Sequence, residues 1–190
     1  MKKNLVFVFV LILMGSSFLM AQAKISVQVG MAFPSGNFSN VATNGYGVGG
    51  TIEFKQDELL SVCAFIGYYT WGPYTVWYLG PSDSYSNFQV MIGLRYAFSQ
   101  QKVHPYMGLD IGMNSLSYSR TTYYGYTSTT TQLTQGRIGA APVFGVIFKV
   151  NTGLNLDINF KYNFTSQELY NANIFPTSFF VLNAGLRFDM

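Results

Sequence analysis

Large apolar residues alternate strictly with small or polar ones along residues 87–98, NFQVMIGLRYAF. The apolar positions share one parity: Phe88, Val90, Ile92, Leu94, Tyr96 and Phe98. Successive side chains of a strand point to opposite faces, so this pattern predicts a strand with one oily and one polar face. Whether the oily face meets a protein core or lipid depends on the rest of the chain.

Eight segments show this alternation, and each is predicted to form a strand. They are KISVQVGMAF (24–33), GYGVGGTIEFK (45–55), LLSVCAFIGYYTW (59–71), residues 87–98, HPYMGLDIGMN (104–114), RIGAAPVFGVIFKV (137–150), LNLDINFKYNF (154–164) and FFVLNAGLRF (179–188). We find no domain boundary among them. An even number of consecutive strands is typical of an up-and-down barrel.

The connections alternate in length, beginning with a long one. The short ones are KQDE (55–58), SQQK (99–102) and VNTG (150–153). The longest is rich in Ser, Thr and Tyr, and its residues 117–134 are expected to be an exposed loop or a strand extension beyond the bilayer. Outer-membrane barrels have short periplasmic turns and long extracellular loops. The pattern therefore predicts an all-β, eight-stranded antiparallel up-and-down transmembrane β-barrel with both termini in the periplasm.

Residues 1–23, MKKNLVFVFVLILMGSSFLMAQA, have the pattern of a cleaved secretory signal peptide. Lys2 and Lys3 precede the apolar run from Leu5 to Met14, and Ala21-Gln22-Ala23 is a small-x-small cleavage site. A transmembrane anchor is the alternative, but the run is short and is followed by Gly and Ser. The predicted organisation is a signal peptide over 1–23 and one barrel domain over 24–190.

Composition favours a membrane barrel over a soluble domain. Charged residues make up 10% of the chain, whereas a soluble domain has roughly 25%. After the signal peptide, no apolar stretch reaches the length of about 18 residues that a spanning helix needs. Removing Lys2 and Lys3 lowers Lys+Arg from 11 to 9 against 8 acids, a net charge of +1. This balance gives no indication of nucleic-acid binding, and the single cysteine, Cys63, is expected to be a buried thiol.

Most of the ionisable residues within strands fall on the less apolar face. With the amide side chains counted, this face carries Gln28, Glu53, Arg95, Asp110, Arg137, Lys149, Asp157, Lys161, Asn183 and Arg187. An Arg or Lys facing lipid at mid-depth costs about 2–4 kcal/mol, so these residues fix the register with the oily face toward lipid. Hairpin geometry predicts three pairs: Arg95 with Asp110, Asp157 with Arg187, and Lys149 with Asp157. An eight-stranded barrel is just wide enough for side chains to fill, so we expect a plugged lumen.

Aromatic residues are expected to form girdles at the two membrane interfaces. Those assigned to the periplasmic ends are Phe54, Phe98, Phe148 and Phe188, and those assigned to the extracellular ends are Tyr68, Trp71 and Tyr162.

Candidate chemical motifs are weak. Gly45, Gly47 and Gly50 match G-x-G-x-x-G, but a strand runs through them where a dinucleotide site needs a helix; small residues on an inward face explain them better. His104, the only histidine, follows a short turn and has no obvious nucleophile beside it. No catalytic, cofactor-binding or metal-binding residues are predicted, no cofactor is expected, and an enzyme is the least favoured interpretation.

The order of several motifs resembles a known family. VGMAFPSGNFSN, GYGVGG, LRYAF followed by a short turn and HPYMGLDIG, LNLDINFKYNF and a final NAGLRF resemble the outer membrane protein β-barrel domain family, the OmpA/OmpX-like small barrels. The resemblance covers essentially all of residues 24–190. The last strand ends on Phe188 followed by Asp189 and Met190, which departs from the strict terminal aromatic of the barrel-assembly signal.

The functional expectation is an integral outer-membrane barrel with a structural or surface-interaction role through its outer loops. Its partners would be outer-membrane lipid and a surface ligand or protein that the sequence does not identify, and the barrel is expected to be a monomer. Two alternatives remain open at this stage. One is a soluble lipocalin-like binding barrel with the oily face turned inward, and the other is a narrow outer-membrane pore.

Overall fold

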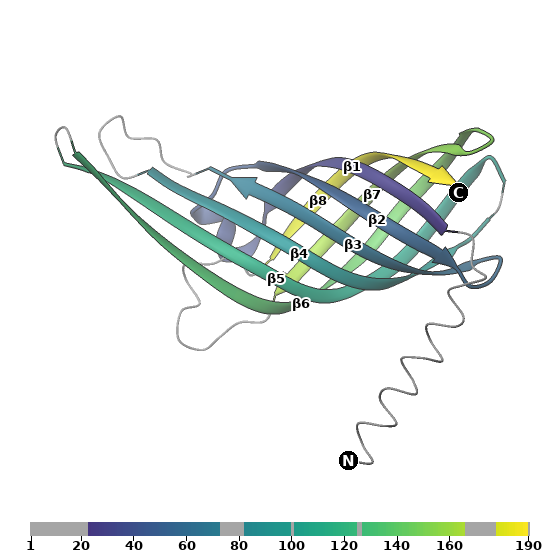
Figure 1. Cartoon of the computed structure of the whole chain (residues 1–190), viewed down its shortest axis with the longest axis horizontal. Coiled ribbons are helices and arrows are strands. Elements are labelled where there is room, and N and C mark those ends of the chain that lie inside the picture. The colour runs from purple at the N-terminus through teal and green to yellow at the C-terminus, as the bar shows by residue number, and fades with distance from the viewer. Residues whose placement is uncertain (1–22, 73–81, 100, 125–126, 166–177, 190) are drawn as a thin grey trace, which may run out of the picture.

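Every alternating segment of the sequence forms a strand in the computed structural model, which describes residues 23–72, 82–99, 101–124, 127–165 and 178–189. Each strand pairs antiparallel with its neighbours in sequence, and β1 also pairs with β8, which closes the barrel (Figure 1). The strands are β1 (Ala23–Pro34), β2 (Gly45–Lys55), β3 (Leu60–Trp71), β4 (Ser82–Ala97), β5 (Val103–Tyr124), β6 (Thr127–Asn151), β7 (Leu154–Thr165) and β8 (Ser178–Asp189). The predicted eight-stranded up-and-down barrel is confirmed.

Three short turns lie at one end of the barrel, as the alternation of loop lengths predicts. They join β2 to β3, β4 to β5, and β6 to β7, at the end where the C-terminus lies (Figure 1). Only Thr152 and Gly153 separate β6 from β7, and Gly153 has φ +110°, which side chains rarely adopt. We call this end the short-turn end. The opposite, long-loop end carries a short 3-10 helix, η1 (Gly36–Asn40).

The two faces of the strands point as the charge pattern predicts. On β4, Val90, Ile92 and Leu94 are 50%, 70% and 54% exposed on the outside of the barrel. By contrast, Lys161 and Asp110 on the polar faces of β7 and β5 are 1% and 0% exposed. A soluble lipocalin-like barrel needs the reverse arrangement, with apolar residues around a central ligand, so that alternative is wrong. Among the described residues, no helix is both long and apolar enough to cross a membrane.

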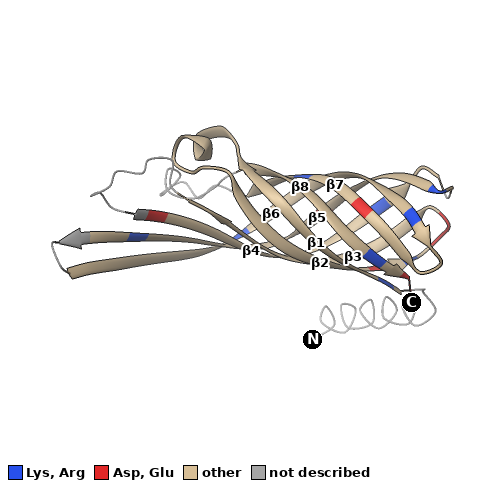
Figure 2. Ribbon diagram, turned by 90° about the horizontal axis from the view of Figure 1, so that it is seen from above, with Lys and Arg blue, Asp and Glu red and all other residues tan. Residues whose placement is uncertain are grey.

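Strands β5 and β6 form an arm at the long-loop end, and β4 accompanies β5 along it as far as Ser82↔Thr121 (Figures 1 and 2). We define the β5–β6 arm as residues 115–124 and 127–136, which pair with each other from Ser115↔Gly136 to Tyr124↔Thr127. Strand β7 pairs with β6 only as far as Gly139↔Thr165. Of the two expectations for residues 117–134, the strand extension is therefore correct over the described residues.

The outward face of the arm changes character where the arm begins. Along β5 the outward positions run from Ile111 and Met113, both about half exposed, to Ser115 and Ser117. The change from apolar to hydroxyl side chains marks the edge of the band suited to lipid, because lipid offers no hydrogen-bond partners. The arm therefore lies beyond this band.

Trp71 does not belong to the outer aromatic girdle predicted for it. It shares the parity of Phe65 and Tyr69, points into the barrel and is 2% exposed. Its indole N–H donates to the Ala32 carbonyl at 3.2 Å, and its ring packs edge-on against Phe179 at a centroid distance of 4.9 Å. Trp71 and Tyr68 are an odd number of positions apart, so they lie on opposite faces of β3. Tyr68 is exposed on the outside as predicted. Of the other predicted girdle residues, Phe98, Phe148 and Phe188 are exposed and Phe54 and Tyr162 are half-buried.

Glycines on the inward face of β2 make room for large rings on β3. A Cβ atom at Gly45 would collide with the Trp71 ring, and one at Gly47 with the Tyr69 ring. The expectation that small inward residues explain the G-x-G-x-x-G match holds for these two. It is wrong for Gly50, which lies on the opposite parity and pairs with Val27 and Ile66. The predicted signal peptide, residues 1–23, lies outside the described residues except for Ala23, which begins β1.

Candidate functional site

The interior of the barrel contains a buried ionic cluster toward the short-turn end. The Lys161 Nζ lies 2.7 Å from Asp110 Oδ2, and the Arg95 guanidinium lies 3.3 Å from the same carboxylate oxygen. The Lys161 ammonium also stands 3.5 Å from the centre of the Phe65 ring. One carboxylate from β5 thus joins cations from β4 and β7. The predicted pairing of Arg95 with Asp110 is confirmed, and the part played by Lys161 is an addition to it.

Two further polar contacts reach across the interior. Arg187 on β8 forms an ion pair of 2.7 Å with Glu53 on β2, over the intervening strand β1. The Tyr106 hydroxyl donates to Asp157 at 2.9 Å. Arg187 therefore reaches Glu53, whereas the prediction paired it with Asp157. The third predicted pair, Lys149 with Asp157, is not in direct register, because Lys149 lies opposite Asn155 near the end of the barrel while Ile147 faces Asp157.

Amide side chains form a hydrogen-bonded network in the middle of the barrel. Gln89 donates through Nε2 to Asn114 at 2.7 Å and to Asn163 at 3.0 Å. On the β7–β8–β1 side, Asn183 donates to Asn159 at 2.9 Å, and Asn159 donates to Gln28 at 3.1 Å. Amides suit this layer because each supplies both donors and an acceptor. The network satisfies them only in part, since Gln89 Oε1, Asn114 Nδ2 and Asn163 Nδ2 have no hydrogen-bond partner among the described residues.

An aromatic layer lies above the amides, at the long-loop end. Phe38 from η1 is buried and meets Trp71 and Tyr85 edge-on, with centroid distances of 5.4 and 5.3 Å. Tyr69 and Phe179 extend this cluster, with centroids 5.8 Å apart. The helix η1 therefore places an aromatic side chain in the barrel mouth. Parity along β3 could have found Tyr69 and Trp71, but nothing in the sequence shows that a loop residue such as Phe38 turns inward.

The β5–β6 arm carries hydroxyl pairs and one ion pair. Ser117 and Thr134 hydroxyls lie 3.0 Å apart, as do those of Thr121 and Thr130. Arg120 holds Asp83 of β4 through two contacts of 2.8 and 2.9 Å. These hydrogen bonds from the guanidinium lower the pKa of the Asp83 carboxyl below its ordinary value. Asp83 and Arg120 are register partners, so the ion pair reinforces the pairing of β4 with the arm.

His104 and Cys63, the two residues considered for reactivity, make contacts typical of structural residues. His104 Nδ1 lies 2.7 Å from the Ser99 carbonyl oxygen at the β4–β5 turn. Cys63 is buried as predicted, with its Sγ 3.7 Å from Asp110. Among the residues that the structure describes, no group of three or more His, Cys, Asp or Glu is placed to hold a metal ion.

Solved structures of the same architecture share little sequence identity with this chain. A major outer membrane protein from Thermus thermophilus has a TM-score of 0.65 at 16% identity, covering 88% of this chain and 99% of that one. Neisserial surface protein A has a TM-score of 0.57 at 18% identity, covering 88% and 97%. The attachment invasion locus protein Ail of Yersinia pestis, solved with the heparin analogue sucrose octasulfate, has a TM-score of 0.52 at 14% identity, covering 88% and 99%. These likenesses show the fold.

A closed eight-stranded barrel with an apolar outside, a polar inside and long connections at one end is a small outer-membrane β-barrel. A comparison with curated proteins gave no match. A family model described as "Opacity family porin protein" matches residues 92–190, more than half of the chain. The chain belongs to this family of outer-membrane porin-like proteins, in agreement with the resemblance to OmpA/OmpX-like barrels. Its location is the outer membrane, with the short-turn end and both ends of the barrel domain toward the periplasm.

Proposed function

We propose that this protein acts at the cell surface by binding a partner through its β5–β6 arm. The observation that carries the proposal is the length of β5 and β6, which pair for ten residues beyond the apolar band, from Ser115↔Gly136 to Tyr124↔Thr127. A hairpin that only had to close the barrel would need none of this length. Backbone pairing, together with the Arg120–Asp83 ion pair, gives the arm a defined shape before it meets a partner.

The charge of the extracellular connections indicates a partner of low charge. Across residues 34–44, 72–87, 115–136 and 165–178, the charged residues are Asp83, Arg120 and Glu168. Because Arg120 is engaged by Asp83, these segments offer little to attract a polyanion. Hydroxyl groups dominate the arm and supply adaptable hydrogen bonds. The heparin analogue on Ail is therefore a poor guide to this chain, and an uncharged surface is the better match.

Shortening the arm is expected to weaken adhesion of the protein to cells while leaving the barrel folded. The variant joins Leu116 to Gln135 through Asn-Gly, a dipeptide suited to a two-residue hairpin turn. Beads coated with proteoliposomes of the intact protein should adhere to cultured epithelial cells, and adhesion of the shortened variant should fall about tenfold or more, since loss of even 1.4 kcal/mol of contact has this effect. Removing heparan sulfate from the cells with heparinase should leave adhesion of the intact protein unchanged.

The control is Gln101→Ala, an exposed change at the periplasmic end. Heat-modifiable migration on SDS gels establishes that each variant has folded. Equal adhesion by the intact and shortened proteins, or adhesion lost after heparinase, would contradict the proposed role of the arm.

We further propose that the barrel is closed to solutes. Three features support this proposal: the ionic cluster around Asp110, the amide network around Gln89, and Phe38 in the outer mouth. An eight-stranded barrel leaves room for little more than its own side chains. Because these layers follow one another along the axis, a solute would have to displace all three.

Purified protein in planar bilayers is therefore expected to give no stepwise current at about 100 mV, a voltage at which moving one charge across the membrane yields about 2.3 kcal/mol. A larger porin added to the same bilayer serves as the positive control. Reproducible single-channel steps from this protein alone would show that the second early alternative, a narrow pore, is correct.

A further inference from the structure

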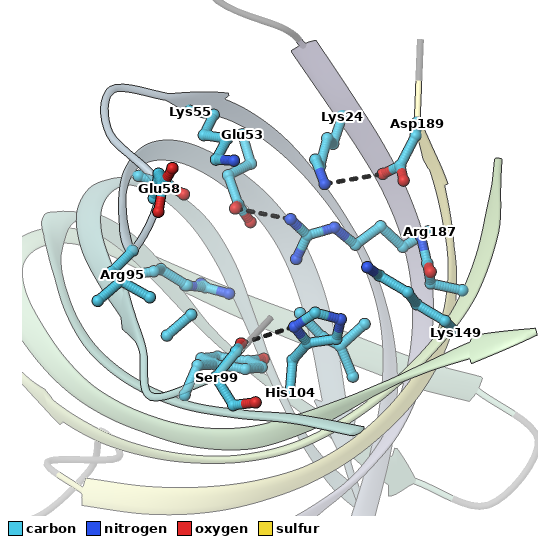
Figure 3. A pocket seen from close by; sticks show the side chains of 16 residues that line it. Lys24, Glu53, Lys55, Glu58, Arg95, Ser99, His104, Lys149, Arg187 and Asp189 are labelled. Atoms are coloured by element: carbon cyan, nitrogen blue, oxygen red, sulfur yellow. Dashed lines mark hydrogen bonds and ion pairs between the residues drawn. The ribbon is translucent and has the colours of Figure 1, made fainter. Parts of the chain in front are cut away.

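A cavity of about 110 Å³ lies at the periplasmic end of the barrel and opens between the short turns (Figure 3). The cationic groups of Arg95, Lys149 and Arg187 point into it from β4, β6 and β8, so they approach a common centre from different sides (Figure 3). We call this cavity the periplasmic vestibule. Its inner wall includes Arg95 of the ionic cluster around Asp110, but the proposed function assigns no ligand to it.

Positive charge exceeds negative charge in the lining of the vestibule. The lining contains five cations, Lys24, Lys55, Arg95, Lys149 and Arg187, against three carboxylates, Glu53, Glu58 and Asp189, which leaves a net +2 with His104 neutral. Figure 2 shows the same gathering of charged residues toward the end where the C-terminus lies. A concave site with walls of low dielectric concentrates this charge and raises the local concentration of anions.

The two arginines of the lining, Arg95 and Arg187, have hydrogen-bond donors that contacts among the described residues do not satisfy. Arg95 and Arg187 are each 7% exposed, so both residues are more than nine-tenths buried. Arg95 shares its carboxylate, Asp110, with Lys161, so one negative charge serves two cations. Within the described residues, the Nε atoms of Arg95 and Arg187 have no hydrogen-bond partner. An anion in the vestibule would balance the positive charge around it.

We infer that the periplasmic vestibule binds a phosphate group. A phosphate carries about −1.5 to −2 charges near pH 7, which matches the net charge of the lining. Its tetrahedral oxygens suit cations that approach from several directions, and arginine and lysine are the usual partners of phosphate in proteins. The volume corresponds to several water molecules at roughly 30 Å³ each, enough for one such group. The phosphate is either free orthophosphate or a monoester at the end of a larger periplasmic molecule.

Calorimetric titration of the folded protein tests this inference. The protein is held in an uncharged maltoside detergent at mildly alkaline pH and constant ionic strength, and orthophosphate, glycerol phosphate and acetate are added in separate runs. We expect one phosphate per barrel and no heat from acetate. If orthophosphate and glycerol phosphate bind equally well, the site accepts a monoester. If orthophosphate alone binds, the site is assigned to the free ion.

Three variants distinguish specific phosphate binding in the vestibule from nonspecific attraction of anions to a basic surface. Lys149→Gln is expected to weaken phosphate binding about tenfold, as the loss of one charge-assisted hydrogen bond implies. Glu53→Gln removes a competing carboxylate and releases Arg187, so it should tighten binding severalfold. Lys102→Gln is the matched control, because Lys102 is an exposed lysine of the same rim outside the lining. Absence of phosphate heat, an equal effect of Lys102→Gln, or weaker binding by a folded Glu53→Gln protein would overturn the inference.

Discussion

Asp110→Asn is expected to lower the free energy of unfolding by about 3–5 kcal/mol, the usual effect of removing one partner of a buried ion pair. The substitution keeps the size of the side chain but leaves the cations of Lys161 and Arg95 facing each other without their shared carboxylate. Asp110 is fully buried, so water cannot take its place. Urea unfolding of the protein in lipid vesicles, followed by tryptophan fluorescence, measures the change.

A second substitution distinguishes the loss of charge balance from simple damage to packing. In the Asp110→Asn background, Lys161→Met removes one unbalanced cation and keeps a long apolar stem against the Phe65 ring. The double variant should recover a large part of the lost stability. Asp57→Asn, in an exposed turn at the periplasmic end, should change it by less than about 0.5 kcal/mol. Unfolding energies that are equal for Asp110→Asn and Asp57→Asn would exclude the proposed role of the cluster.

Ile92→Arg is expected to destabilise the folded barrel by about 2–4 kcal/mol, because a cation at mid-depth on the lipid face loses its hydration. Ile92 is 70% exposed on the outside of β4, in the middle of the apolar stretch that runs from Val90 to Leu94. Steric effects are small at an exposed position, so lipid is the main cause. The measurement is again urea unfolding in vesicles.

The matched control is Gln132→Arg, which adds the same side chain at an exposed position of the β5–β6 arm. Beyond the apolar band an arginine stays hydrated, and the expected change is within about 0.5 kcal/mol. Equal destabilisation of the two variants would show that the lipid-facing apolar band has been placed at the wrong height on the barrel.

The sequence was sufficient to predict the strands and the direction of their faces. Residues such as Ile92 and Arg95 alternate with a period of two, and only one register keeps the cations out of lipid. The Arg95–Asp110 contact lies within one hairpin and could be predicted from the β4–β5 turn, although the same reasoning failed for Arg187. Loop length then distinguished the two ends of the barrel.

Tertiary structure alone decided which side chains meet across the interior. Lys161 joins Asp110 from β7 to β5, and Arg187 joins Glu53 from β8 to β2, so each contact passes over an intervening strand. Such contacts depend on how the strands tilt and stagger when the sheet closes, and these quantities leave no mark in a period-two pattern. The same holds for the arm: whether its Ser- and Thr-rich residues form a loop or paired strands depends on hydrogen bonds between β5 and β6, because side chains of this kind fit either state.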